Sequence, residues 1–124
     1  MRHQLYYTIA ILFALLMVVF TAPPAFAQQD HDPMCEMTTI ASLQHCVTHA
    51  QAMGHIDNTG VANSLLQKLD AAQAAENRGQ TAVAVNQLEA FIQAVEAQLG
   101  KHIDADHGTH MIHHAQMVIA ALGG

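Results

Sequence analysis

The sequence contains no tryptophan, only 5% aromatic residues and three prolines. Basic residues are also scarce, since four lysines and arginines stand against ten aspartates and glutamates, for a formal charge of −6 with neutral histidines. Nucleic-acid binding needs a basic surface that neutralises phosphates, so this balance argues against a nucleic-acid partner. Alanine and leucine dominate where aromatic residues are missing, and this composition favours closely packed helices.

Several catalytic and cofactor motifs are absent as well. The chain has no H-E-x-x-H, no C-x-x-C and no C-x-x-C-H, so a zinc protease, a dithiol redox centre and attached haem are not predicted. Ser64 has no G-x-S-x-G context. No nucleophile–base pair can be recognised, and we therefore expect that the protein is not an enzyme.

One long hydrophobic run is present, from Leu5 to Phe20, and only Thr8 interrupts it. Arg2 precedes the run, and Pro23, Pro24 and the small-residue ending Ala25-Phe26-Ala27 follow it. Together these features make a complete signal-peptide pattern over residues 1–27. The alternative is an uncleaved membrane anchor, for which the run is slightly short. We expect cleavage after Ala27 and a secreted or periplasmic protein.

Cleavage would leave residues 28–124, with three basic and ten acidic residues and a formal charge of −7. A chain of this length forms one domain with a modest core. Residues 28–37 are polar and contain Pro33, which predicts an irregular lead-in. Residues 38–124 are then the folded domain.

The clearest helical pattern lies between Thr81 and Asp104. Its large apolar residues recur at steps of three and four, which is the spacing of one helix face. They are Val85, Leu88, Ile92, Val95 and Leu99, with Phe91 beside Ile92. Gly100 is expected to end this helix, because glycine adopts the left-handed C′ conformation at little cost.

Three further helices are predicted. The first follows a cap at Thr38 or Thr39, the second follows a cap at Asp57, and the fourth follows a cap at Asp104. The connector Gly79-Gln80 is so short that the helices it joins must be antiparallel neighbours. The predicted fold is an all-α four-helix bundle of two antiparallel hairpins, 38–78 and 81–122, preceded by a signal-peptide helix.

A short motif occurs twice, as Gly54-His55-Ile56-Asp57 and as Gly100-Lys101-His102-Ile103-Asp104. Each copy joins one predicted helix to the next. The repetition indicates either a duplicated hairpin or the same favourable turn chemistry used twice, and the sequence leaves both open.

The two cysteines, Cys35 and Cys46, are 11 residues apart near the expected mature N-terminus. In an oxidising compartment they are expected to form a disulfide that pins the lead-in to the first helix. The alternatives are a thiol metal site that includes Met34 and Met37, or a bond to another chain.

Histidines are unusually frequent, with ten in the chain. Pairs at i, i+4 lie one above the other on a helix and can share a Zn²⁺, Cu²⁺ or Ni²⁺ ion. His45 and His49 form one such pair and His110 and His114 the other, and both pairs are predicted to face solvent, opposite the apolar faces of their helices. The candidate metal ligands are His45, His49, His107, His110 and His114. The alternative is a hydrophilic surface that happens to use histidine.

Several blocks of the chain resemble the FIMAH domain, a small all-α module often found at the C-terminus of secreted bacterial proteins. The blocks are Gly60-Val61-Ala62-Asn63-Ser64-Leu65-Leu66, Lys68-Leu69-Asp70-Ala71-Ala72, Ala84-Val85-Asn86-Gln87-Leu88, Ala90-Phe91-Ile92, Val95 and Gly100-Lys101-His102-Ile103. The resemblance covers roughly residues 55–122 and implies an accessory or binding module, without catalytic residues that can be carried over. The histidine-rich fourth helix and the missing attached enzyme depart from the family pattern.

These observations predict an exported, non-catalytic helical domain that binds a protein or a component of the cell envelope. Contact with a membrane is expected only through the signal segment, if that segment stays uncleaved. The alternative function is a periplasmic metal-binding protein that uses the surface histidine pairs.

Overall fold

A computed structural model describes residues 33–124, so the predicted signal segment 1–27 and the cleavage site after Ala27 lie outside the described residues. The described part holds four α-helices behind a short 3-10 helix. The elements are η1 (Pro33–Glu36), α2 (Ile40–Ala52), α3 (Thr59–Asn77), α4 (Thr81–Glu96) and α5 (Ala105–Leu122). Within residues 33–124 there is no strand, only isolated bridges between connectors. The all-α prediction is confirmed, and η1 gives the lead-in a turn of helix that was not predicted.

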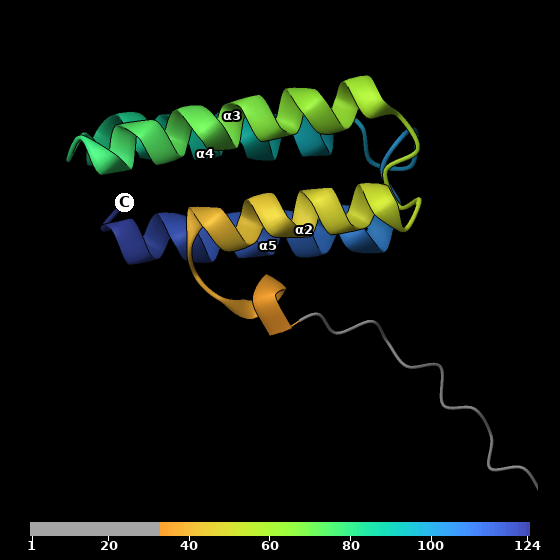
Figure 1. Cartoon of the computed structure of the whole chain (residues 1–124), viewed down its shortest axis with the longest axis horizontal. Helices are drawn as coiled ribbons and strands as arrows, with labels where there is room; N and C mark the ends of the chain where they lie inside the picture. Colours follow the sequence, from red (N-terminus) through yellow and green to blue (C-terminus); the bar gives the residue numbers. More distant parts are fainter. Residues whose placement is uncertain (1–32) are drawn as a thin grey trace, which may run out of the picture. The chain divides into compact units, whose positions relative to one another are not determined.

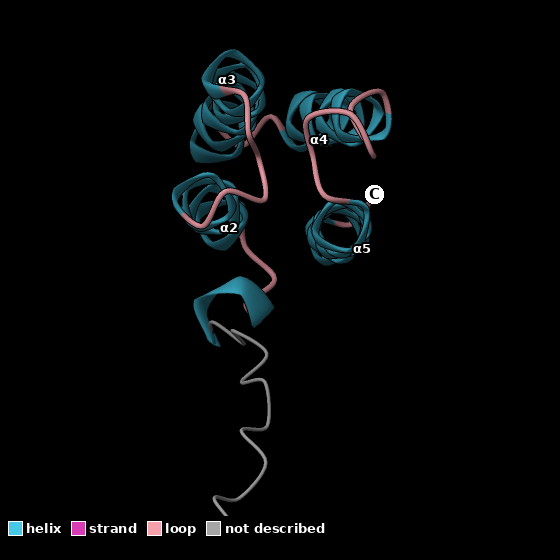
Figure 2. Ribbon diagram, turned by 90° about the vertical axis from the view of Figure 1, so that its right-hand side faces the viewer, coloured by secondary structure: helices cyan, strands magenta, loops and turns pink. Residues whose placement is uncertain are grey.

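The four helices pack in a square, in chain order. Each helix contacts the next one, and α5 closes the square against α2. Seen from the side, α3 and α4 form one layer and α2 and α5 the other (Figure 1). The end-on view shows the same four-cornered arrangement (Figure 2). The predicted bundle of antiparallel hairpins is therefore confirmed.

The core is centred on Phe91, which is fully buried together with Leu88 and Val95 of the same helix. Ile92, which the sequence placed at the centre of the apolar stripe, is only half-buried at its flank. The difference arises because α4 packs against both α3 and α5, so a broad face is covered and the large aromatic ring occupies its middle. The buried face of α4 consists of Ala84, Leu88, Phe91 and Val95.

The N-terminal caps agree with the sequence at two helices. Thr39 caps α2, where its Oγ1 accepts from the backbone N–H of Ser42 at 3.1 Å. Asp104 caps α5, as predicted. At α3, however, the cap is Asn58, whose Oδ1 accepts from the N–H of Val61 at 3.1 Å. The assignment of this cap to Asp57 was wrong, because the Asp57 side chain is bonded to His102 in the α4–α5 connector.

This correction can be tested by substitution. Asn58→Ala should lower the free energy of unfolding by about 1 kcal/mol, because it removes the acceptor for an N–H at the start of α3. Asp57→Ala should cost less, about 0.5 kcal/mol, because it removes only an exposed pair. Urea denaturation of both variants measures the difference, and a larger loss in Asp57→Ala would restore the original assignment.

The helix α4 ends at Glu96, before the predicted stop at Gly100. Gly100 instead completes a tight turn with φ +69°, and its N–H donates to the Ile103 carbonyl oxygen at 2.8 Å. A side chain is strained at this φ, which explains the glycine. The turn returns Ile103 to the core, where it is buried.

None of the helices in residues 33–124 is both long enough and apolar enough to cross a bilayer.

Candidate functional site

The α2–α3 and α4–α5 connectors meet at one end of the bundle (Figure 1). The Asp57 N–H donates to the His102 carbonyl oxygen at 3.1 Å, and the Asp104 N–H donates to the His55 carbonyl oxygen at 2.8 Å. Between these bonds Ile56 and Ile103 face each other in an antiparallel bridge and are 2% and 1% exposed. We call this pairing of residues 55–57 with 102–104 the connector clasp. The repeated motif thus pairs with itself.

The clasp sets each histidine beside the aspartate of the other connector. On one side, His102 Nδ1 lies 2.8 Å from Asp57 Oδ1, and both side chains are exposed. This pair explains why Asp57 does not cap α3.

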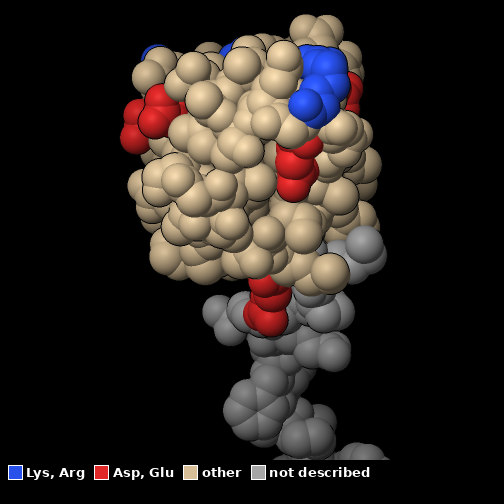
Figure 3. All heavy atoms as spheres, turned by 90° about the vertical axis from the view of Figure 1, so that its left-hand side faces the viewer, with Lys and Arg blue, Asp and Glu red and all other residues tan. Residues whose placement is uncertain are grey.

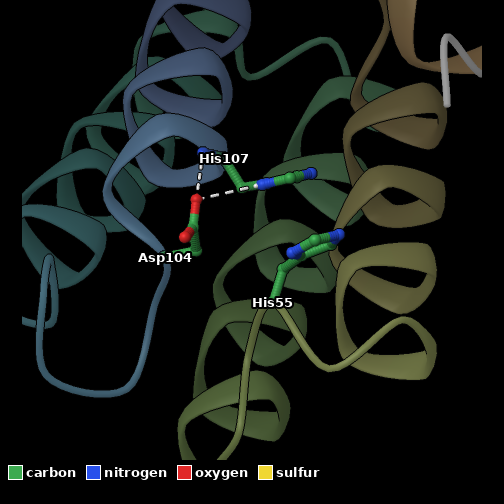
Figure 4. A group of neighbouring side chains, drawn as sticks. All are labelled: His55, Asp104 and His107. Atoms are coloured by element: carbon green, nitrogen blue, oxygen red, sulfur yellow. Dashed lines mark hydrogen bonds and ion pairs between the residues drawn. The ribbon is translucent and has the colours of Figure 1, made fainter. Parts of the chain in front are cut away.

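On the other side, His55 and Asp104 are joined by His107 from the first turn of α5. One ligand atom from each residue lies within 4.8 Å of the other two. The rings of His55 and His107 are stacked, with centroids 3.4 Å apart and an interplanar angle of 14°. Figure 4 shows the two imidazoles running parallel and projecting the same way, with the Asp104 carboxylate beside them. We call these residues the His55–Asp104–His107 cluster.

Asp104 is fixed by its role as the cap of α5. Its Oδ1 lies 3.1 Å from His107 Nδ1 and accepts from the backbone N–H groups of His107 and Asp106 at 3.2 and 3.1 Å. The side-chain bond from His107 is the main cause that lowers the pKa of Asp104, and the backbone bond from His107 adds to it. The carboxylate is therefore ionised at neutral pH.

The sequence predicted only one member of this cluster, His107, as a ligand. It interpreted Asp104 as a cap and gave no role to His55. The available signal was the repeated motif, since two copies that pair antiparallel must bring His55 next to Asp104. His55 and Asp104 are far apart along the chain and meet only in the folded protein. The spacing of residues within one helix cannot predict such a contact.

The predicted histidine pairs are placed as follows. His45 and His49 lie half-buried on α2, with their rings nearly parallel and their centroids 6.2 Å apart. His110 is exposed on α5. Within residues 33–124, the His55–Asp104–His107 cluster alone brings three such ligand atoms within 4.8 Å. No three of the five histidines predicted as ligands come together in this part of the chain, and metal binding by the pair His45 and His49 stays a prediction.

The prediction that His114 faces solvent was wrong, because this residue is 1% exposed. Its Nε2 donates to the Met37 carbonyl oxygen at 2.6 Å and lies 3.1 Å from Ser42 Oγ. Its Nδ1 lies 3.8 Å from Cys46 Sγ. The helix α5 packs against α2 as well as α4, so its buried face includes His114, and polar atoms near the start of α2 satisfy the imidazole.

The cysteines agree with the prediction. The sulfur atoms of Cys35 and Cys46 lie at disulfide distance, and their Cα atoms are 5.3 Å apart. The bond joins η1 to α2, and Cys46 is buried beside His114. It thus fastens the lead-in to the bundle at the place where His114 also holds Met37.

Comparison with known proteins identifies one family. The family model of the FIMAH domain matches residues 40–120, which span nearly the whole bundle. No curated protein and no solved structure matches the chain.

Proposed function

Because the chain belongs to the FIMAH domain family, we propose that it is an exported, non-catalytic domain whose role is to bind a protein or a component of the cell envelope. The observation that carries the proposal is the extent of the family match, which runs from the start of α2 to near the end of α5. Membership of this family implies a helical accessory domain of the kind carried by secreted bacterial proteins. An accessory domain acts by holding its partner rather than by chemistry of its own.

Two features support export. The N-terminal pattern over residues 1–27 is that of a signal peptide. The pairing of Cys35 with Cys46 suits an oxidising compartment, where disulfides persist. Both features point to the periplasm or the exterior of the cell.

One side of the bundle favours a partner that is not recognised mainly through charge (Figure 3). The side of the bundle seen in Figure 3 carries few charged side chains. Large exposed apolar side chains in the described part of the chain are Met37, Met53 and Val83, which belong to three different segments. Residues so scattered do not form one hydrophobic patch, so we expect polar contacts to dominate recognition of the partner.

Export is tested by expressing the full-length chain in a bacterium and measuring the intact mass of the soluble protein. We expect a chain that begins at Gln28, with both thiols blocked to alkylation until reductant is added. A membrane-bound product that retains residues 1–27, or a mature chain with free thiols, would contradict the proposal.

Binding is tested by titrating the labelled, exported protein onto an envelope preparation of the source cell. Saturable binding that an excess of unlabelled protein displaces is the expected result. A matched sample reduced and heat-denatured before labelling controls for adhesion of unfolded chain. Binding that does not saturate, or that equals the denatured control, would argue against an accessory role.

A further inference from the structure

We propose that the His55–Asp104–His107 cluster binds one divalent transition-metal ion of the Zn²⁺, Ni²⁺ or Cu²⁺ class. This site is separate from the partner-binding role, and either can fail without the other. The proposal replaces the predicted His45/His49 and His110/His114 pairs as the place where a metal would bind.

The donor atoms suit this class of ion. Two imidazole nitrogens and one carboxylate oxygen are the mixed nitrogen and oxygen set that borderline cations prefer, whereas Ca²⁺ and Mg²⁺ require mostly oxygen. Protein ligands of this number leave a fourth tetrahedral position for water.

The geometry is close to that of a bound site. The candidate ligand atoms lie within 4.8 Å of one another. Around a tetrahedral Zn²⁺ they would be about 3.4 Å apart, given bonds of about 2.1 Å. To converge on one ion the stacked imidazoles must turn toward each other, and His107 must bind through its other ring nitrogen or release its bond to Asp104. Solvent can reach the site, since the His107 and Asp104 side chains are 44% and 50% exposed.

The backbone has already organised the three residues. Asp104 Oδ1 holds the first turn of α5 and bonds to His107, so these two residues are ordered before any ion arrives. The clasp brings in His55 through the bond from the Asp104 N–H to the His55 carbonyl oxygen. A metal bound here would therefore link the α2–α3 connector to the start of α5, and with it the two hairpins.

The second side of the clasp supplies a matched control. It carries the equivalent residues His102 and Asp57, whose side chains are hydrogen-bonded to each other. Three residues after Asp57, however, the chain has Gly60 where the first side has His107. With only two ligands, this side should bind a metal far more weakly. His102→Ala thus removes an imidazole from the same clasp without touching the proposed site.

The experiment titrates Zn²⁺ into the exported protein while the imidazole resonances are followed by NMR, with affinity measured by competition against a chromophoric chelator. We expect His55 and His107 to respond first, at one equivalent of Zn²⁺. We also expect His55→Ala/His107→Ala to weaken binding by at least about tenfold, since even supporting residues of metal sites cost about 10–100-fold when lost. The Zn²⁺ affinities of His102→Ala and of His45→Ala/His49→Ala should stay within about twofold of the parent's affinity, because neither variant removes a ligand of the proposed site.

The first response of other histidines, or an equal loss in His102→Ala, would overturn the proposal. So would unchanged binding in the double variant, or no binding by the parent protein at millimolar Zn²⁺. If the alanine variant proves unstable by circular dichroism, His55→Gln/His107→Gln keeps the side-chain volume and removes the imidazoles. The parent should also melt at a higher temperature with Zn²⁺ present, and the glutamine variant should lose that shift.

Discussion

Replacing Phe91 by alanine should lower the free energy of unfolding by about 3–5 kcal/mol, the usual cost of deleting a fully buried aromatic ring. Phe91 is 0% exposed and lies in the middle of the face that α4 presents to both of its neighbours. The cavity that remains is bounded by helices on both sides, so little of it can collapse. Urea denaturation followed by circular dichroism measures the loss.

The control for Phe91→Ala is a substitution at the next residue, Ile92. Ile92→Ala removes a side chain that the periodicity placed at the centre of the stripe but that the structure leaves half-buried. We expect this variant to lose about half as much or less, since its transfer and cavity contributions scale with burial. Val83→Ala, at a position 44% exposed, should cost about 0.5 kcal/mol or less. A larger loss in Ile92→Ala than in Phe91→Ala would show that α4 is rotated from its described position.

Breaking the bond between Cys35 and Cys46 should lower the free energy of unfolding by about 2–3 kcal/mol, because a short closed loop no longer constrains the unfolded chain. For a domain of this size that corresponds to a fall in Tm on the order of 10 °C. Differential scanning calorimetry of the exported protein with and without reductant measures the change.

The variant Cys35→Ala/Cys46→Ala separates the bond from other effects of the reductant. It should melt near the reduced parent and should not respond to reductant. If the parent melts at the same temperature in both conditions, the bond between η1 and α2 contributes nothing to the stability of the bundle.

Local patterns were sufficient to predict much of this fold. The steps of three and four identified the helices, because burial of one face repeats with the turn of the helix. Asp104, and either Thr38 or Thr39, were predicted as caps because a side-chain acceptor before a helix satisfies the orphan N–H groups within a few residues. Cys35 and Cys46 could be paired since the sequence offers each of them one partner.

The errors share a different physical cause. Asp57 was predicted as the cap of α3, but its side chain pairs with His102 in the clasp, and Asn58 is the cap instead. His114 looked exposed because one helix was considered alone, whereas two neighbours cover α5. Both outcomes depend on which segment, distant in the sequence, packs against the residue in the fold. The spacing of residues along one helix does not encode that contact.

The same reasoning explains the candidate site. His107 and Asp104 are near neighbours in sequence, and their bond belongs to the first turn of α5. His55 reaches them only because the repeated motif pairs across two connectors. The fold therefore assembles a cluster that no single helix could present.

Anomalous diffraction from crystals of the exported protein grown with Zn²⁺ examines this assembly most directly. We predict that the strongest peak lies between the imidazoles of His55 and His107 and the carboxylate of Asp104. A strongest peak at His45 and His49, or at His110, with none at the meeting point of the two connectors, would contradict it.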